Sequence, residues 1–331
     1  MKRVVLLNDT SLESHYGCVK VKDKFVKLFE MLGWDCVGCF PVGCAESLLI
    51  DSLSLLDFDL AVVNGEGTIH DGNAYADQLL AVCVELRLQG KSVILLNSSI
   101  YTTSSYKLDV LKTSFDLISV RSKFVRSELK KKGIDAIYMP DFSFIFSEGS
   151  SRWKGEGGVV YTDSVFNGVS FGLMLESFLC NGEYRPFIYP PHDRSLSVLR
   201  YIKRYYATCV SLRDYLVFIW VALYGVLKSS SAESIDSLLL RSSKVITGRF
   251  HAVCFCIRLG VPFECVDSNT SKIEDLLSDV KVDHLFSVNN GRRVIAENKL
   301  IEYGRLCEEF MAEVCDLEQS LIQRLRGIGK C

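Results

Sequence analysis

The residues best suited to chemistry lie in the stretch VITGRFHAVCFCIRLGVPF, residues 245–263. Its two leading apolar residues predict a buried strand, and its later apolar run predicts a helix that ends at Gly260. Between them a turn carries Arg249 and His251 at the N-terminus of that helix. A helix N-terminus favours anions, arginine offers a planar fork for carboxylate or phosphate, and histidine transfers protons near neutral pH. The pattern indicates either an anion site with a proton-transfer group or an ordinary strand–helix turn, and spacing alone leaves both open.

A second group of polar residues follows three predicted strands of the first half, which end in LLNDTS, VVNGEGT and LLNSSI. The carboxyl ends of parallel strands meet at one edge of an α/β sheet, where such sheets bind their ligands. Any one of these residues could instead cap a helix, and it is their convergence that favours a binding surface. The candidate residues are Asn8, Asp9, His15, Asn64, Glu66 and Ser98.

The elements that must position these residues alternate between strand and helix. In the first half, apolar patterning predicts strands at 4–8, 60–64, 93–97, 117–120 and 134–139 and helices at 19–32, 75–89 and 123–132. In the second half it predicts strands at 159–162, 186–189, 245–246 and 263–266 and helices at 195–227, 252–259, 272–280 and 300–325.

This alternation predicts an α/β fold with parallel sheets covered by helices. A polar, glycine-rich segment at 147–158 separates the two halves. We therefore predict two Rossmann-like lobes, at 1–148 and 158–293, that face each other across a cleft in the manner of the GT-B fold. A closing helix within 294–331 packs across or beside the lobes.

Bulk composition excludes several classes of protein. The chain has 331 residues with a net charge of −2, which does not suit a nucleic-acid binder. Its 13 cysteines lie scattered in apolar runs, and the one C-x-x-C pair, Cys36 and Cys39, has no partner cluster, so we expect buried, reduced thiols, with redox or zinc use of that pair as the alternative. The D-x-D of Asp57 and Asp59 precedes a strand instead of following one, which indicates a structural role. Without a set at metal-ligand spacing, we predict no metal and no cofactor.

Hydropathy predicts a cytoplasmic protein. The four apolar residues after Arg3 are too few for a secretion signal, and the longest apolar run, 215–227, is shorter than the roughly 20 residues that span a bilayer. Segment 195–227 begins with basic and aromatic residues and then turns apolar. This composition suits either a peripheral contact with the inner face of the plasma membrane or a core helix with a solvated basic end.

Seven pieces of the chain together resemble the polysaccharide pyruvyl transferase family, and the resemblance covers most of the chain. These pieces are NDTSLESHYGC (8–18), DLAVVNGEGT (59–68), ISVRSKFVRSELKKKG (118–133), MPD (139–141), ITGRFHA (246–252), LGVPF (259–263) and DSNTSKIEDLL (267–277). Their order and spacing are more specific to the family than to one reaction within it.

The resemblance implies a GT-B-like fold and transfer of a pyruvyl group from phosphoenolpyruvate to a sugar of a surface polysaccharide or its lipid-linked precursor, forming a pyruvate ketal. The family's Arg and His of the R-[LF]-H-[AS] turn fall on Arg249 and His251, so His251 would be the general acid or base. The donor would be held by Arg249, Gly248, Arg121, Asn269 and Lys272, and the acceptor by the strand-end residues above.

The chain departs from the family where many members carry a run of glycines, because it has Asn64-Gly65-Glu66-Gly67 there. Two alternatives therefore stand beside the transferase. One is a GT-B glycosyltransferase that uses a nucleotide-activated sugar, and the other is a non-catalytic member that binds a glycan.

Overall fold

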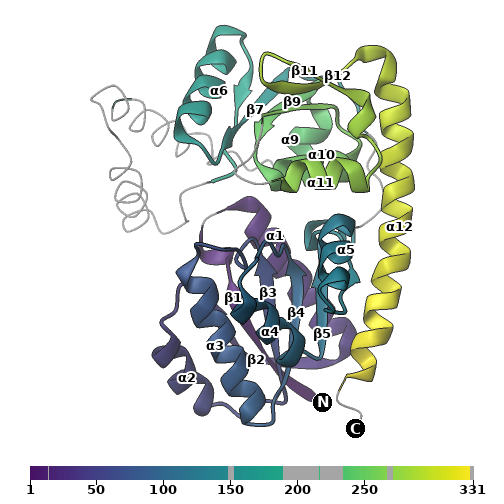
Figure 1. Cartoon of the computed structure of the whole chain (residues 1–331). Helices are drawn as coiled ribbons and strands as arrows, with labels where there is room; N and C mark the ends of the chain where they lie inside the picture. The colour runs from purple at the N-terminus through teal and green to yellow at the C-terminus, as the bar shows by residue number, and fades with distance from the viewer. Residues whose placement is uncertain (14, 148–152, 189–215, 217–233, 267–270, 329–331) are drawn as a thin grey trace. The chain divides into compact units, whose positions relative to one another are not determined.

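The computed structural model describes residues 1–13, 15–147, 153–188, 216, 234–266 and 271–328 (Figure 1). The chain forms two compact units. Unit 1 comprises Met1–Leu12, Lys20–Ser147 and Phe310–Cys331, and unit 2 comprises Glu13–Val19 and Glu148–Glu309. The units thus do not follow simple chain order, because the short segment Glu13–Val19 counts with unit 2 although it lies early in the chain.

Unit 1 is built on a six-stranded, fully parallel sheet in the order β2-β1-β3-β4-β5-β6. Its strands are β1 (Lys2–Asp9), β2 (Trp34–Pro41), β3 (Leu60–Glu66), β4 (Ser92–Ser98), β5 (Leu117–Val120) and β6 (Ile137–Tyr138). The helices along this part of the chain are α1 (Tyr16–Leu32), α2 (Glu46–Ser54), α3 (Ala74–Leu88), α4 (Ser105–Thr113) and α5 (Lys123–Lys131). The central strands are buried on both faces, which explains their continuous apolar runs.

One face of this sheet forms a single apolar core with the helices that cover it. Val5, Ala61 and Leu95 from three adjacent strands pack in one cluster with Leu80 of α3 and Leu111 of α4. Alternate residues of a strand point to opposite faces, so this face takes every second residue of each apolar run. The cluster holds the strands in register and thereby brings their polar carboxyl ends to one edge.

Unit 2 has a mixed six-stranded sheet in the order β11-β12-β10-β9-β7-β8. The strands β7 (Val159–Ser164), β8 (Glu183–Tyr184), β9 (Lys244–Gly248) and β10 (Phe263–Val266) are parallel, and β11 (Phe286–Asn289) and β12 (Arg292–Ile295) form an antiparallel hairpin on β10. Asn290 and Gly291 turn this hairpin with positive φ at both residues, the geometry for which an Asn-Gly pair is suited. The helices within its described residues are α6 (Asn167–Leu179), α9 (Ile235–Arg241), α10 (Phe250–Leu259) and α11 (Lys272–Asp279).

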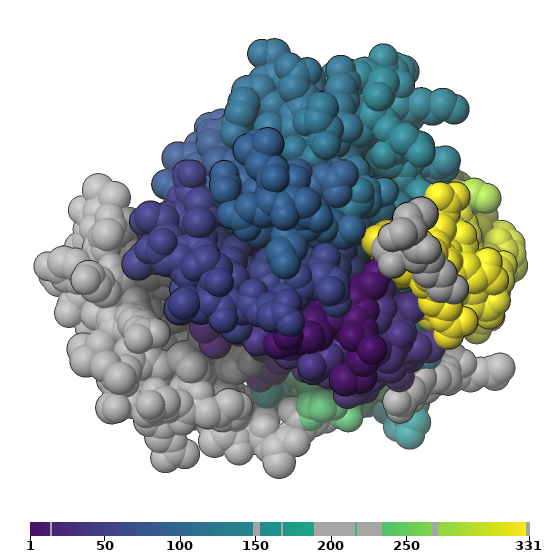
Figure 2. Space-filling model, turned by 90° about the horizontal axis from the view of Figure 1, so that it is seen from below, coloured from purple at the N-terminus to yellow at the C-terminus, as the bar shows by residue number. Residues whose placement is uncertain are grey.

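A long C-terminal helix, α12 (Leu300–Gly327), contributes to both cores. In unit 2 the hydroxyl of Tyr303 donates to the carbonyl of Val261 at 3.0 Å. In unit 1 the ring of Phe310 lies edge-on to Phe144, with centroids 5.3 Å apart. Lys2 donates to the carbonyl of Ile328, and Figure 2 shows the purple N-terminal residues on the surface near the yellow end of this helix. Short 3₁₀ turns occur at Ser11–Glu13, Phe142–Phe144, Asp283–Leu285 and Glu297–Lys299.

The predicted class is confirmed in its two parallel-rich α/β sheets and its C-terminal helix, and the cleft between the lobes stays a prediction. For the described residues 186–188 the expected strand is wrong, because the strand that pairs with β7 is Glu183–Tyr184 and Pro186 has no N–H to donate to a ladder. Apart from residue 216, the predicted helix 195–227 lies outside the described residues. Within the described residues no helix is both long and apolar enough to cross a membrane.

Candidate functional site

The strand–helix connection that the sequence singled out is tighter than expected. β9 runs to Gly248 and α10 begins at Phe250, so the predicted five-residue turn is reduced to Arg249, the N-cap residue. The side chain of Arg249 makes no cap hydrogen bond to α10. Gly260 ends the helix in the left-handed conformation, with φ of 66°, as its position predicted. The connection therefore holds Arg249 and His251 within one turn of the N-terminus of α10.

A buried ion pair fixes the guanidinium of Arg249. Its Nε donates to Oδ2 of Asp163 at 2.8 Å, and its Nη2 donates to the same oxygen. Ser164 pairs with Gly248 in the parallel register of β7 and β9, so Asp163 and Arg249 leave neighbouring strand ends side by side. Arg249 is 9% and Asp163 5% exposed, so two charges sit in the interior and compensate each other. The pattern of residues did not identify Asp163, which is 86 positions from Arg249.

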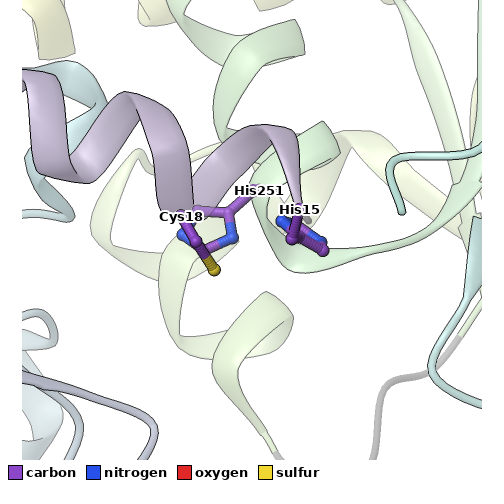
Figure 3. Close-up of side chains that lie close together, drawn as sticks. All are labelled: His15, Cys18 and His251. Atoms are coloured by element: carbon purple, nitrogen blue, oxygen red, sulfur yellow. The ribbon is translucent and has the colours of Figure 1, made fainter. Parts of the chain in front are cut away.

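His251 lies against the backbone of α1. A Cβ added at Gly17 would stand 2.1 Å from Cγ of His251, closer than any real Cβ contact, so this position accepts only glycine without movement. The imidazole is buried, and its centroid lies 5.3 Å from that of His15 (Figure 3). The start of α1 thus limits where the His251 ring can lie.

His15 is brought to the same place through Phe187. The carbonyl of Phe187 accepts from the N–H of Tyr16 at 3.0 Å, and its own N–H donates to Oδ1 of Asp163 at 2.7 Å. One residue therefore connects the Asp163–Arg249 pair to the start of α1. Nδ1 of His15 accepts from the N–H of Gly17 at 3.1 Å, so the neutral ring of His15 carries its proton on Nε2.

Cys18 completes a group of three side chains that offer metal ligands. The donor atoms of His15, Cys18 and His251 all lie within 4.8 Å of one another (Figure 3). Two imidazoles and a thiol suit an ion such as Zn²⁺. Coordination through His15 would have to displace either the Gly17 N–H from Nδ1 or the proton from Nε2, so the set as it stands fits proton transfer better than metal binding. The expectation that the site needs no metal stays a prediction.

The strand-end residues of unit 1 form a separate, internally bonded network. Nδ2 of Asn8 donates to the carbonyl of Asn64 at 2.6 Å, and Nδ2 of Asn97 donates to Oδ1 of Asn64 at 3.1 Å. Glu66 accepts from Asn64 at 3.2 Å and from Thr10 at 2.6 Å through Oε1. Three adjacent strands are thus joined at their carboxyl ends, which is where the sequence placed a polar surface.

Burial limits what this network can touch. Asn8, Asn64 and Ser98 are at most 2% exposed, and a Cβ at Gly65 would stand 2.4 Å from Ser98. Asp9 is bonded to Lys22 at 2.7 Å. Acceptor binding by Asn8, Asp9, Asn64, Glu66 and Ser98 therefore stays a prediction, and the structure gives these side chains a role inside unit 1. His15 separates from this group, because it belongs to unit 2 beside His251.

The remaining donor candidates are distributed over both units. Arg121 belongs to unit 1, where its Nη1 donates to Asp141 at 2.7 Å and its Nη2 to Ser99 at 2.7 Å. In unit 2, Gly248 allows close strand packing, since a Cβ there would stand 2.5 Å from Ser164. Lys272 begins α11, and Asn269 lies outside the described residues. Asp57 and Asp59 both bond to Arg3 at the start of β1, which fits the structural role expected for them.

The sequence pattern of one protein family matches residues 7–270, which is most of the chain, and that family is described as polysaccharide pyruvyl transferase. The chain belongs to the polysaccharide pyruvyl transferase family. The match includes both the start of α1 and the β9–α10 connection, the two segments that meet at His251. Family membership implies a transferase that acts on a saccharide.

Comparisons with curated sequences and with solved structures add little to the family match. None of the curated protein sequences matches this member of the polysaccharide pyruvyl transferase family. An uncharacterised protein of Klebsiella pneumoniae has a similar structure, with a TM-score of 0.44 and 11% identity over 84% of this chain and 88% of its own. The pneumococcal O-GlcNAc transferase GtfA, solved with UDP and GlcNAc, gives a TM-score of 0.35 at 11% identity over 85% of this chain and 54% of its own. The family assignment thus rests on the family's sequence pattern alone.

Replacement of Asp163 by alanine is expected to lower the free energy of unfolding by about 3–5 kcal/mol, because it breaks a buried, hydrogen-bonded ion pair with the Arg249 guanidinium. Urea unfolding followed by circular dichroism measures the change. The matched control is Glu309→Ala, which breaks the exposed Arg305–Glu309 pair of α12 and should change stability by less than about 0.5 kcal/mol. Equal unfolding midpoints for both variants would show that the buried Asp163–Arg249 pair does not stabilise the fold.

Proposed function

We propose that this chain transfers a pyruvyl group from phosphoenolpyruvate to a sugar of a surface polysaccharide or of its lipid-linked precursor, forming a pyruvate ketal. The observation that carries the proposal is the pair of imidazoles, His15 and His251, 5.3 Å apart at the N-terminus of α10 in a chain of the polysaccharide pyruvyl transferase family. The reaction needs one group that gives a proton and one that takes a proton, and two histidines can supply both near neutral pH.

The chemistry sets the roles of these groups. A proton is added to the methylene carbon of the donor, and two sugar hydroxyls attack the neighbouring carbon while the C–O bond to phosphate breaks. Each hydroxyl loses its proton, and the phosphate leaves as inorganic phosphate. His251 acts as the general acid and base of these transfers. His15, whose neutral ring carries its proton on Nε2, orients the acceptor or shares the proton.

The electrostatics of the helix terminus at the same place favour the anionic donor. The N-terminus of α10 carries the positive end of the helix dipole, and Arg249 is the N-cap residue at that terminus. Hydrogen bonds from Nε and Nη2 to Asp163 hold the guanidinium of Arg249 in place beside this terminus. We propose that Arg249 contacts the donor's carboxylate or phosphate, with Gly248 lining the approach and Lys272 and Asn269 as further donor ligands.

The expected acceptor also suggests a location. A lipid-linked saccharide would be met at the cytoplasmic face of a membrane, and segment 195–227 is the part of the sequence whose composition suits a peripheral contact. This segment lies outside the described residues apart from residue 216.

Phosphoenolpyruvate is expected to stabilise the protein in a thermal-shift titration. A ligand at 100 times its Kd adds about 2.7 kcal/mol to the free energy of unfolding, whereas CMP-, UDP- and GDP-linked sugars should add nothing. Arg249→Ala should lose the shift, and His251→Ala should keep it because the proton-transfer group is not the main anion ligand. A shift with a nucleotide sugar alone would indicate a glycosyltransferase. No shift with any of these compounds would favour a non-catalytic glycan-binding protein.

A further inference from the structure

The only C-x-x-C pair of the sequence lies on β2, the edge strand of the unit 1 sheet. In a regular strand residues three apart point to opposite faces. Here a bulge changes the count, because Val4 of β1 pairs with Cys36 and the next residue, Val5, pairs with Gly38. Cys36 and Cys39 consequently stand opposite Val4 and Leu6, which share one face of the sheet. The two Sγ atoms lie 3.6 Å apart.

Both thiols are exposed, which corrects the expectation that the cysteines are buried; Cys180 and Cys315 are exposed as well. Lys22 reaches this pair from α1, with its Nζ 2.8 Å from Sγ of Cys39 and 2.7 Å from Oδ2 of Asp9. A cation at this distance favours the thiolate, which is the nucleophilic form of cysteine. When Cys39 carries the negative charge, the thiol of Cys36 is the donor of the hydrogen bond between the two sulfurs.

The pKa shifts of the two thiols agree with Cys39 as the thiolate and Cys36 as the hydrogen-bond donor. The hydrogen bond from Cys36 lowers the pKa of the Cys39 thiol to about 6, with Lys22 adding to the effect and burial opposing it. The same hydrogen bond raises the pKa of Cys36. Near neutral pH one sulfur of the pair is therefore a thiolate and the other keeps its proton, the arrangement in which one thiol attacks and the second follows.

We propose that Cys36 and Cys39 form a site of thiol–disulfide exchange with small, soluble disulfides. The thiolate of Cys39 attacks one sulfur of R–S–S–R, a Cys39–S–S–R bond forms, and R–S⁻ leaves. The thiol of Cys36 then loses its proton to solvent and attacks Sγ of Cys39, and the second R–S⁻ leaves. The balance is two protein thiols and one disulfide giving one protein disulfide and two free thiols, so the protein is oxidised and the small disulfide is reduced.

The position of the pair permits this step. The two sulfurs must approach from 3.6 Å to about 2.05 Å. Among the strands that the structure describes, β2 pairs with β1 alone, and its bulge already departs from the regular ladder, so the strand can adjust. Exchange also removes the negative charge that Cys39 shares with Lys22, which leaves Lys22 with Asp9 at the carboxyl end of β1.

The test exposes the reduced, full-length protein to oxidised glutathione at pH 6, quenches with an alkylating agent and maps each cysteine by mass spectrometry. Cys39 should react roughly tenfold faster than Cys315, an exposed cysteine of α12 that serves as the internal control. The final product should carry a Cys36–Cys39 disulfide and no adduct. Equal rates for Cys39 and Cys315, or a lasting glutathione adduct on Cys39, would overturn the proposal.

Two variants separate the roles of the neighbours. Cys36→Ser keeps a hydroxyl that can donate to Cys39, so it should preserve the fast first step and trap the mixed disulfide. Lys22→Met should move the pH midpoint of Cys39 alkylation upward and slow the reaction several-fold at pH 6. Lys20→Met is the matched control, since residues two positions apart on α1 point to different sides of the helix. An unchanged midpoint in Lys22→Met, with the fold intact by circular dichroism, contradicts the assignment.

Discussion

Replacement of His251 by alanine is expected to lower kcat/KM for pyruvyl transfer by about 10²- to 10⁴-fold, the range typical of a general acid or base. The proposed reaction adds a proton to carbon and removes protons from two hydroxyls, and alanine can do neither. Release of inorganic phosphate from phosphoenolpyruvate in the presence of acceptor measures the rate. The variant should still bind the donor, so the loss should fall on kcat more than on KM.

The control for this variant is His284→Ala. His284 also belongs to unit 2, but its side chain is 57% exposed and its nearest charged partner is Glu302. Transfer by His284→Ala should match that of the unchanged protein. If His251→Ala retained near-full turnover while still folding, the acid–base role of His251 would be wrong, and the proton would have to come from another group such as His15.

Replacement of Gly17 by alanine is expected to lower kcat by about 10²-fold, although Gly17 has no side chain that could react. The added Cβ would stand 2.1 Å from Cγ of His251, so the imidazole or the start of α1 must shift by an ångström or more. A misplacement of about 1 Å at a reacting group costs rate on this scale. The same transfer assay measures the effect, with circular dichroism to confirm that the variant folds.

Gly172→Ala is the matched control for a glycine inside a helix of unit 2. A Cβ at Gly172 meets nothing within 4 Å, so alanine there should leave activity unchanged and raise helix stability by about 0.5–1 kcal/mol. In the double variant Gly17→Ala/His251→Gly, the Gly17 change should cost little more than His251→Gly alone, because both the ring and the Cβ that the new methyl group would meet are absent. Additive losses in the double variant would show that Gly17 acts elsewhere.

Much of the fold could be predicted from apolar patterning. Continuous apolar runs such as 60–64 and 93–97 are buried on both faces and became central strands. The edge strand β2 was not predicted, because its residues are at most half-buried and show no such run. The hairpin of β11 and β12 carried an Asn-Gly turn signal that could have been found.

The sequence by itself determined that a strand, an arginine and a histidine meet the N-terminus of a helix near Gly248, since short-range spacing governs that geometry. Only the tertiary structure decided which residues contact Arg249 and His251. Asp163, Gly17 and His15 reach Arg249 and His251 from distant parts of the chain, through strand pairing and the start of α1. A pattern of neighbours cannot reveal such contacts, because they depend on which strands pair and in which register. The same reason explains Cys36 and Cys39, whose spacing predicts opposite faces until a bulge places them on one.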